Sequence, residues 1–288
     1  MKKIFASILT VTLALVLLAS CGNAGFDETK RISVVAREDG SGTRSAFMEL
    51  LGLKGKADVS GVIVATGTAA VLAEVKGNPL AIGYDSLGYV TDEVKILRVD
   101  GVAPTVENIK SGAYAISRPL NVVYQESRMT NAANAAFLTF LQSADAQTII
   151  AENGYVSTKD SAVAYTPVPS LTGKITISGS TSLKPLMELL AAAFEAVQSG
   201  VEVSVGGGRS GTGYNDAKNG VSDLGMISET FSSAKAENCT YYEVARDGIA
   251  VIVNKSNPND DISSEALKCI YDRDAGDSAI TTWADVAR

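Results

Sequence analysis

The chain has 288 residues, of which 46% are hydrophobic and 20% are charged, and its formal net charge is −7; this suits one large domain or two lobes with sizeable cores. The acidic balance argues against nucleic acid as a partner and against basic patches that would hold anionic lipid. Histidine is absent, which removes the commonest general base and the commonest transition-metal ligand. We therefore expect no metal centre and no cofactor.

The N-terminus has the pattern of an export signal. Two lysines precede an apolar run that is too short to be a comfortable transmembrane helix, and the run ends in a Leu-Ala-Ser triplet directly before Cys21. This arrangement resembles the lipobox of bacterial lipoproteins. We predict a lipoprotein signal peptide over residues 1–20, lipidation of Cys21 and a tether over residues 21–30. The alternative is an ordinary signal peptide that happens to have a cysteine near its cleavage site.

The first unit after the tether has the order strand, loop, helix. A β-branched run at Ile32–Ala36 predicts a strand, and a turn-rich loop follows at Arg37–Thr43. Apolar residues at helical spacing then predict a helix over Arg44–Leu51. Further strands are predicted at 61–65 and 80–84.

The same kind of unit recurs later in the chain. A helix predicted over 132–152 is followed by a polar, proline-bearing connector at 157–173. A strand at 175–177 then leads into a small polar loop at 178–182. The clearest helix of the chain follows over Leu186–Val197, with a proline near its start and a glycine just past its end.

The remaining strands are predicted at 201–205, 224–227 and 249–254. Short strands that alternate with helices predict an α/β protein with largely parallel sheets. The chain stops at Trp283–Arg288 without an obvious closing element.

Three strand-to-helix loops rich in Gly, Ser and Thr are suited to holding an anion; they lie at 39–43, 178–182 and 206–213. The first N–H groups of a helix lack intrahelical partners and carry the positive end of its dipole, and hydroxyls add short donors. Each loop alone is also compatible with a simple N-cap and turn. A nucleotide site is disfavoured, because the glycine run lacks the Gly-Lys-Ser/Thr of a P-loop and precedes a short, polar helix.

Three charged residues near these loops, Arg37 and two acids, indicate which anion could bind. The arginine presents a planar fork of donors that suits an oxyanion. A carboxylate beside a bound anion makes sense only if the anion keeps a proton to donate, as hydrogenphosphate does and sulfate at neutral pH does not. Asp39 and Glu229 are candidates for that acceptor. The alternatives are that Asp39 caps the following turn and that Glu229 is solvated or capping.

Five short motifs carry a family resemblance: REDGSGTR at 37–44, GSTSLKPL at 179–186, SGTG at 210–213, DLGMIS at 223–228 and DGIAVIVN at 247–254. Together they resemble the phosphate-binding proteins of phosphate-specific ABC importers. The resemblance implies a two-lobed periplasmic-binding-protein-like α/β fold, each lobe a mostly parallel or mixed sheet flanked by helices. It also implies a monomeric, non-enzymatic lipoprotein on the outer face of the bacterial cell membrane, with inorganic phosphate and the importer's membrane subunits as partners.

The resemblance also implies a set of phosphate ligands contributed by both lobes. One lobe would supply Arg37, Asp39, Ser41, Gly42 and Thr43. The other lobe would supply Thr181, Ser182, Ser210, Ser228 and Glu229.

The order of the motifs is rotated relative to the family, in which the Gly-Ser-Thr-Ser segment comes first. We therefore expect a circular permutation in which residues 157–173 join the family's usual ends. Lobe one is then expected to comprise residues 31–112 and 256–288, and lobe two residues 113–255. Permutation of this kind is tolerated where the new ends lie at the surface.

Three other functions remain open: a binding protein for another oxyanion, a hydrolase with Ser41 or Ser210 as nucleophile, and a sensory or surface-interaction lipoprotein. The hydrolase lacks histidine and has no recognisable lysine base in the loops. Cys239 and Cys269 are compatible with a disulfide or with two small buried hydrophobic residues.

Overall fold

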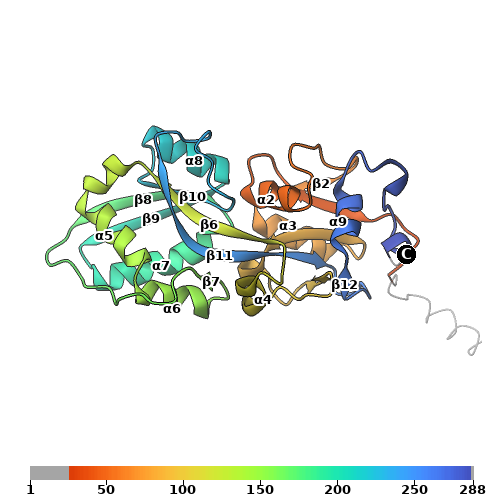
Figure 1. Ribbon diagram of the computed structural model, residues 1–288, viewed down its shortest axis with the longest axis horizontal. Helices are drawn as coiled ribbons and strands as arrows, with labels where there is room; N and C mark the ends of the chain where they lie inside the picture. The colour runs from red at the N-terminus through yellow and green to blue at the C-terminus, as the bar shows by residue number, and fades with distance from the viewer. Residues whose placement is uncertain (1–25, 287–288) are drawn as a thin grey trace, which may run out of the picture.

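The computed structural model describes residues 26–286, so Cys21 and the predicted signal peptide lie outside the described residues. Two α/β lobes lie side by side and are joined by two long antiparallel strands, β6 (Ser117–Tyr124) and β11 (Thr240–Val253) (Figure 1). Hydrogen bonding continues from one lobe into the other through β11. The expected two-lobed α/β architecture is therefore present.

The hydrophobic clusters show where the chain changes lobe. One buried cluster contains Tyr114 and Ile116 together with inward-facing side chains of 249–253. A separate cluster contains Leu120 and Val122. We define lobe one as residues 26–116 and 249–286, and lobe two as residues 117–248. Both changes of lobe lie a few residues away from the boundaries expected from the sequence, because β6 and β11 themselves run across the junction.

Lobe one is built around the central strand β1, which pairs in parallel with β2 on one side and β3 on the other. The second half of β11 then pairs antiparallel with β3 and with β4. The elements of this lobe, besides β11, are β1 (Ser33–Arg37), α2 (Gly42–Leu50), β2 (Ile63–Ala65), α3 (Thr68–Gly77), β3 (Ala81–Ser86), η2 (Leu87–Tyr89), β4 (Lys95–Ile96), β5 (Arg98–Val99), α4 (Val106–Ser111), β12 (Asp261–Ile262), α9 (Ser264–Tyr271), η4 (Gly276–Ser278) and α10 (Trp283–Val286).

Lobe two repeats this plan around β8, which pairs in parallel with β9 and β10. Strand β10 pairs antiparallel with β6, and β6 with the first half of β11. The remaining elements are η3 (Glu126–Thr130), α5 (Ala132–Leu141), α6 (Ala144–Glu152), β7 (Val156–Ser157), β8 (Gly173–Ser180), α7 (Lys184–Val197), β9 (Val201–Gly208), α8 (Ser210–Asn219) and β10 (Leu224–Ile227). The recurring strand-loop-helix unit of the sequence is thus the central unit of each lobe.

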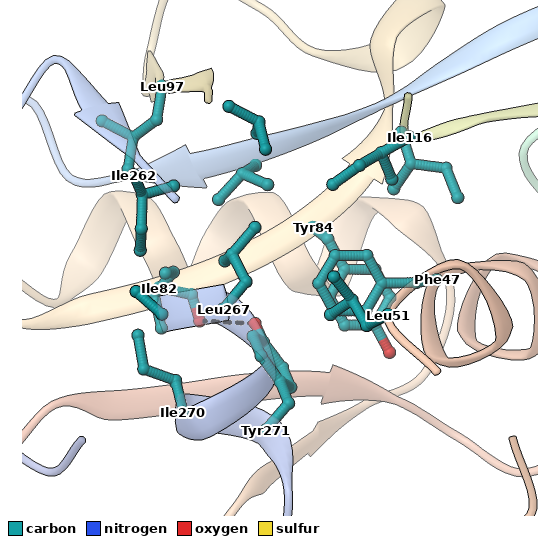
Figure 2. Close-up of a cluster of buried hydrophobic side chains, with 14 of the residues drawn as sticks. Phe47, Leu51, Ile82, Tyr84, Leu97, Ile116, Ile262, Leu267, Ile270 and Tyr271 are labelled. Carbon is teal, nitrogen blue, oxygen red and sulfur yellow. Dashed lines mark hydrogen bonds between the residues drawn. The ribbon is translucent and has the colours of Figure 1, made fainter. Parts of the chain in front are cut away.

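The core of lobe one joins segments from both ends of the chain (Figure 2). Phe47 of α2 stacks on Tyr84 of β3 with ring centroids 3.9 Å apart, and Tyr271 of α9 meets Phe47 edge-on at 5.0 Å. The Tyr271 hydroxyl donates to the carbonyl oxygen of Val35 at 3.2 Å. Helix α9 is therefore an integral part of the lobe that carries β1.

The two described ends of the chain lie together in lobe one (Figure 1). The Ile32 amide donates to the Thr281 carbonyl at 2.8 Å. The short helix α10 was not predicted; it buries Trp283, whose indole N–H donates to the Leu80 carbonyl at 3.1 Å. A segment this short has too few apolar residues to show helical periodicity, so its sequence does not predict a helix.

One predicted helix, over 132–152, is two helices in the structure. Helix α5 ends at Leu141, and Ser143 caps the start of α6 by accepting a hydrogen bond from the Ala146 amide at 3.3 Å. A serine N-cap satisfies an orphan amide donor and favours a new helix start. The connector predicted at 157–173 contains only the ends of β7 and β8, as expected of a linking segment.

Three further expectations concern membranes, metals and cysteines. Within residues 26–286 no helix combines the length and the apolar run needed to cross a bilayer. The same residues contain no cluster of three or more potential metal-ligating side chains. Cys239 and Cys269 are half-buried free thiols, so neither the disulfide nor the full burial considered for them is present.

Candidate functional site

A small, tightly lined cavity lies between the lobes, where β1, β8, β9 and β10 end. The carboxyl ends of parallel strands are the usual ligand site of open α/β sheets. Helices α2, α7 and α8 begin beside this cavity, so their free N–H groups and positive dipole ends converge on it. The lining residues are Arg37, Ser41, Gly42, Thr43, Ser180, Thr181, Ser182, Arg209, Ser210 and Ser228.

Lobe one contributes the loop between β1 and α2. Ser41 is the N-cap of α2, and its hydroxyl accepts from the Arg44 amide at 3.3 Å. Gly42 must be glycine, because a Cβ there would lie 2.2 Å from the Ser210 Oγ of the opposite lobe. Thr43 is buried, and its Oγ1 lies 2.9 Å from the Ser182 Oγ across the lobe boundary. The two lobes therefore touch through hydroxyl groups of the cavity lining.

Lobe two contributes hydroxyls from three strand ends. The Ser180 Oγ accepts from the Ser182 amide at 3.2 Å, which shapes the turn into α7. The Ser210 Oγ accepts from the Ser228 amide at 3.0 Å, and the two hydroxyl oxygens are 3.4 Å apart. This bond ties the start of α8 to the end of β10, so both hydroxyls are held at one point of the cavity.

Arg37 is the buried cation of the cavity, with 2% of its surface exposed. Its Nε donates to Glu38 at 2.9 Å, and its Nη2 donates to the Thr181 Oγ1 in lobe two at 3.3 Å. Burial opposes the ionisation of Glu38, but the hydrogen bond and charge of Arg37 prevail and lower the pKa of that carboxyl. The Nη1 of Arg37 has no hydrogen-bond partner among residues 26–286. Because buried donors are almost always paired, this group is suited to binding an anionic ligand.

Asp39 and Glu229, which were expected to contact the ligand, do not line the cavity. The Asp39 side chain is 96% exposed and pairs with the Arg44 Nη1 at 3.4 Å. The Glu229 carboxylate pairs with the Lys235 ammonium at 2.6 Å. Asp39 thus points into solvent, whereas Glu229 is buried and held by Lys235. Among the described residues no acidic side chain lines the cavity. The arrangement in this structure therefore gives no support to the argument for phosphate from these two carboxylates, and their contact with a ligand stays a prediction.

The other eight expected ligands, Arg37, Ser41, Gly42, Thr43, Thr181, Ser182, Ser210 and Ser228, all line the cavity. Two lining residues were missed by sequence reasoning, Ser180 and Arg209. Both lie inside loops that the sequence analysis singled out as anion loops. Composition identified the loops, but which of their side chains turn inward depends on how the lobes meet.

A buried polar cluster at the junction of the lobes lies directly behind the cavity. The Arg118 Nη2 of β6 donates to the Asp247 carboxylate of β11 at 3.0 Å. The same carboxylate oxygen accepts from the Ser86 hydroxyl of lobe one at 2.8 Å. The Nη1 of Arg118 donates to the carbonyl of Ser228, a lining residue of lobe two, at 3.2 Å. This cluster connects both lobes to the lining of the cavity.

Asp85 completes this region. It is fully buried, its Oδ1 accepts from the Ser86 amide at 2.8 Å, and its Oδ2 has no hydrogen-bond partner within residues 26–286. Burial raises the pKa of Asp85 to about 7, although the positive charges of Arg37 and Arg118 oppose the shift. Its signal in the sequence is a single charged residue inside a strand that is otherwise uncharged.

The raised pKa of Asp85 predicts a pH dependence of stability. An unfolded aspartate titrates near 3.9, so between about pH 4 and about pH 7 the folded protein holds a proton that the unfolded chain has lost. Stability should therefore fall as pH rises through this window. Urea unfolding from pH 4 to pH 8 should show that Asp85→Asn lacks this loss and gains on wild type by on the order of a few kcal/mol, since one pKa unit is worth about 1.4 kcal/mol. The exposed Asp92→Asn should follow wild type, and parallel profiles for wild type and Asp85→Asn would contradict the prediction.

Comparison with known proteins gives the family. A profile of the PBP superfamily domain matches residues 20–145 and 164–288. The chain is 37% identical over 284 residues to phosphate-binding protein PstS 2 of Streptococcus agalactiae, covering 94% of each chain. The chain belongs to the phosphate-binding protein family of the PBP superfamily. Another family member, phosphate-binding protein PstS 2 of Streptococcus pneumoniae, is 32% identical over 92% of each chain.

A solved structure of this family confirms the fold. The phosphate-binding protein of a phosphate ABC transporter from Streptococcus pneumoniae matches with a TM-score of 0.70 at 32% identity, over 89% of this chain and 99% of that one. The family and the two-lobed α/β fold expected from the sequence motifs are thus confirmed. The rotated order of the motifs is not tested by these comparisons and stays a prediction.

Proposed function

We propose that this chain captures inorganic phosphate outside the cytoplasm and delivers it to the membrane subunits of an ABC importer. The observation that carries the proposal is the buried Arg37 guanidinium, whose Nη1 lacks a partner among the described residues, in a cavity lined mostly by serine and threonine. The family members from two Streptococcus species are both named phosphate-binding proteins, which supports phosphate as the ligand.

The side chains that line the cavity can bind an oxyanion that has lost its water shell. The Thr181 Oγ1 accepts from Arg37, which leaves its own hydrogen to donate to a ligand. The serine hydroxyls and the first amides of three helices supply further donors. Because these donors come from both lobes, an anion bound here favours the closed arrangement, as in hinge closure of other two-lobed proteins.

The preference for phosphate over sulfate rests on hydroxyl groups in this proposal, and not on carboxylates. A hydroxyl both donates and accepts, so it can accept the proton of hydrogenphosphate. In the Thr43–Ser182 pair one hydroxyl donates its hydrogen to the other, so it can face an anion only as an acceptor. Sulfate brings no proton for this oxygen and leaves it unpaired. An unsatisfied buried polar group costs about 1–3 kcal/mol.

A titration of the chain that starts after Cys21 tests both parts of the proposal. We expect calorimetry to show one phosphate bound per chain, and an equal concentration of sulfate should displace only a minor part of it. Tight sulfate binding would assign the cavity to oxyanions in general. Absence of phosphate binding would remove the proposed function.

The chain is proposed to act without catalysis. The hydroxyls of Ser41 and Ser210 accept hydrogen bonds from backbone amides, and no lysine lines the cavity within residues 26–286. A serine nucleophile needs an adjacent general base. The hydrolase alternative therefore has no support from the geometry of these two serines.

The proposed location is the outer face of the bacterial cell membrane, with a lipid anchor on Cys21 and a monomeric binding domain. The lipobox-like residues before Cys21 support the anchor. Membrane fractionation of wild type against Cys21→Ser tests it, and equal membrane retention of both would contradict the anchor.

A further inference from the structure

We propose that Arg209 is a latch that holds the two lobes closed over bound phosphate and so sets the rate of its release. This inference rests on the proposed phosphate-binding function. It assigns to Arg209 a role distinct from that of Arg37, the buried cation of the same cavity.

Arg209 lies between β9 and α8 and reaches across the lobe boundary. It occupies the N-cap position of α8, but its side chain makes no capping hydrogen bond. Its Nη1 donates instead to the Asp39 carbonyl of lobe one at 3.1 Å. Its aliphatic stem lies over Gly40, where an added Cβ would be 3.7 Å from the Arg209 Cδ. The side chain thus spans the mouth of the cavity that it lines.

A second contact reinforces the first at the same turn. The Gly211 amide of α8 donates to the Gly40 carbonyl of lobe one at 3.1 Å. Two donors of lobe two therefore hold two consecutive carbonyls, at a turn where Gly40 has a φ of +80° that favours glycine. Separation of the lobes at the cavity breaks both bonds together.

These two contacts serve closure and not ligand binding, because carbonyl oxygens are acceptors and do not bind an anion. The other cross-lobe bonds of the cavity, from Arg37 to Thr181 and between Thr43 and Ser182, join groups that also face the ligand. A bound anion competes for those groups. The Arg209 bond to lobe one remains available when the ligand is present.

Because Arg209 is exposed, its proposed role in lobe closure can be tested without disturbing the fold. The residue is exposed, unlike Arg37, and an exposed arginine contributes little to the stability of either lobe. Removal of its side chain should therefore change the balance between open and closed forms and leave each lobe folded. Interface changes of this kind act mainly on the dissociation rate.

The test is a chase experiment on the soluble chain. Protein loaded with radiolabelled phosphate is mixed with excess unlabelled phosphate, and the dissociation rate constant is measured for wild type, Arg209→Ala and Arg246→Ala. Arg246 is a matched control, because it is a half-exposed arginine of lobe two that pairs with Glu243 away from the cavity.

We expect about tenfold faster release from Arg209→Ala, since a charge-assisted hydrogen bond at closure is lost. Association should change less than about twofold, thermal unfolding of the ligand-free protein should be unchanged, and Arg246→Ala should match wild type.

Two results would overturn the latch. The first is wild-type release from Arg209→Ala. The second is slower association of Arg209→Ala with unchanged release, which would make Arg209 an attracting charge at the mouth. In both cases wild type still binds phosphate and the proposed function stands. Failure of wild type to bind phosphate is a different result, and it rejects the proposed function itself.

Discussion

Replacement of Arg37 by alanine should weaken phosphate binding by about 100-fold or more. The Arg37 guanidinium is buried, and its Nη1 has no partner among residues 26–286. Loss of one partner from a buried, hydrogen-bonded charge pair costs about 2–5 kcal/mol, and each 1.4 kcal/mol is about tenfold in affinity. Among the described residues, Arg37 is the one buried charged side chain in the cavity lining, so no neighbouring group replaces its charge in the dry interior.

Arg44→Ala is the matched control for this experiment. Arg44 lies on α2, close to the cavity in sequence, but its guanidinium pairs with Asp58 and Asp39 outside the cavity. Calorimetric titration of both variants should show near wild-type affinity for Arg44→Ala, with circular dichroism confirming that both are folded. An Arg37→Ala protein that binds phosphate within about threefold of wild type would place the anion elsewhere.

Replacement of Asp247 by alanine should destabilise the protein by about 3–5 kcal/mol. The Arg118–Asp247 pair is 3.0 Å long, and its side chains are 1% and 0% exposed. Burial raises the pKa of Asp247, while the Arg118 charge and the Ser86 hydroxyl oppose the shift. Removal of the carboxylate leaves the Arg118 charge buried without its partner, and breaking such pairs typically costs this much. The midpoint of urea unfolding reports the loss.

Two comparison proteins make this prediction specific. The double variant Arg118→Met/Asp247→Leu removes both charges and should recover a large part of the stability, because buried pairs are often replaceable by apolar residues. Glu202→Ala breaks the exposed pair with Lys174, whose side chains are 78% and 65% exposed for Lys and Glu, and should change stability by less than about 1 kcal/mol. An Asp247→Ala protein as stable as wild type would contradict the role of this pair.

The recovery in the double variant should not extend to ligand binding. Arg118 also donates to the Ser228 carbonyl, and methionine does not supply this donor. We therefore infer that the pair both stabilises the junction of the lobes and holds one strand of the ligand site in place.

Much of the fold was predictable from local pattern. The strand at 224–227 was predicted with its observed bounds, and the units around β1 and β8 followed from β-branched runs, small polar loops and helical spacing. The loops around the cavity were predictable too, because Gly, Ser and Thr before a helix have a physical use that depends on nearby residues alone. The predicted helix over 132–152 failed where one capping serine, Ser143, outweighed a continuous apolar pattern.

The carboxylates show the limit of such reasoning. The sequence placed Asp39 and Glu229 beside anion loops, and they do follow β1 and β10. The direction of each side chain was decided by its partner, Arg44 for the first and Lys235 for the second. Adjacency along the chain does not report such pairings.

By itself, the sequence determined the family, the two α/β units and the loops that surround the ligand cavity, because strands, helix starts and hydroxyl-rich turns are encoded by neighbouring residues. Only the tertiary structure decided which charges face the cavity, since Arg37 is buried against Thr181 of the other lobe while Asp39 and Glu229 pair with basic side chains of their own lobe. Arg209 meets Asp39 and Arg118 meets Ser228 only when the lobes are assembled around β6 and β11. The anion loops line the cavity between the lobes, and among the described residues hydroxyls and arginines face it where carboxylates were expected.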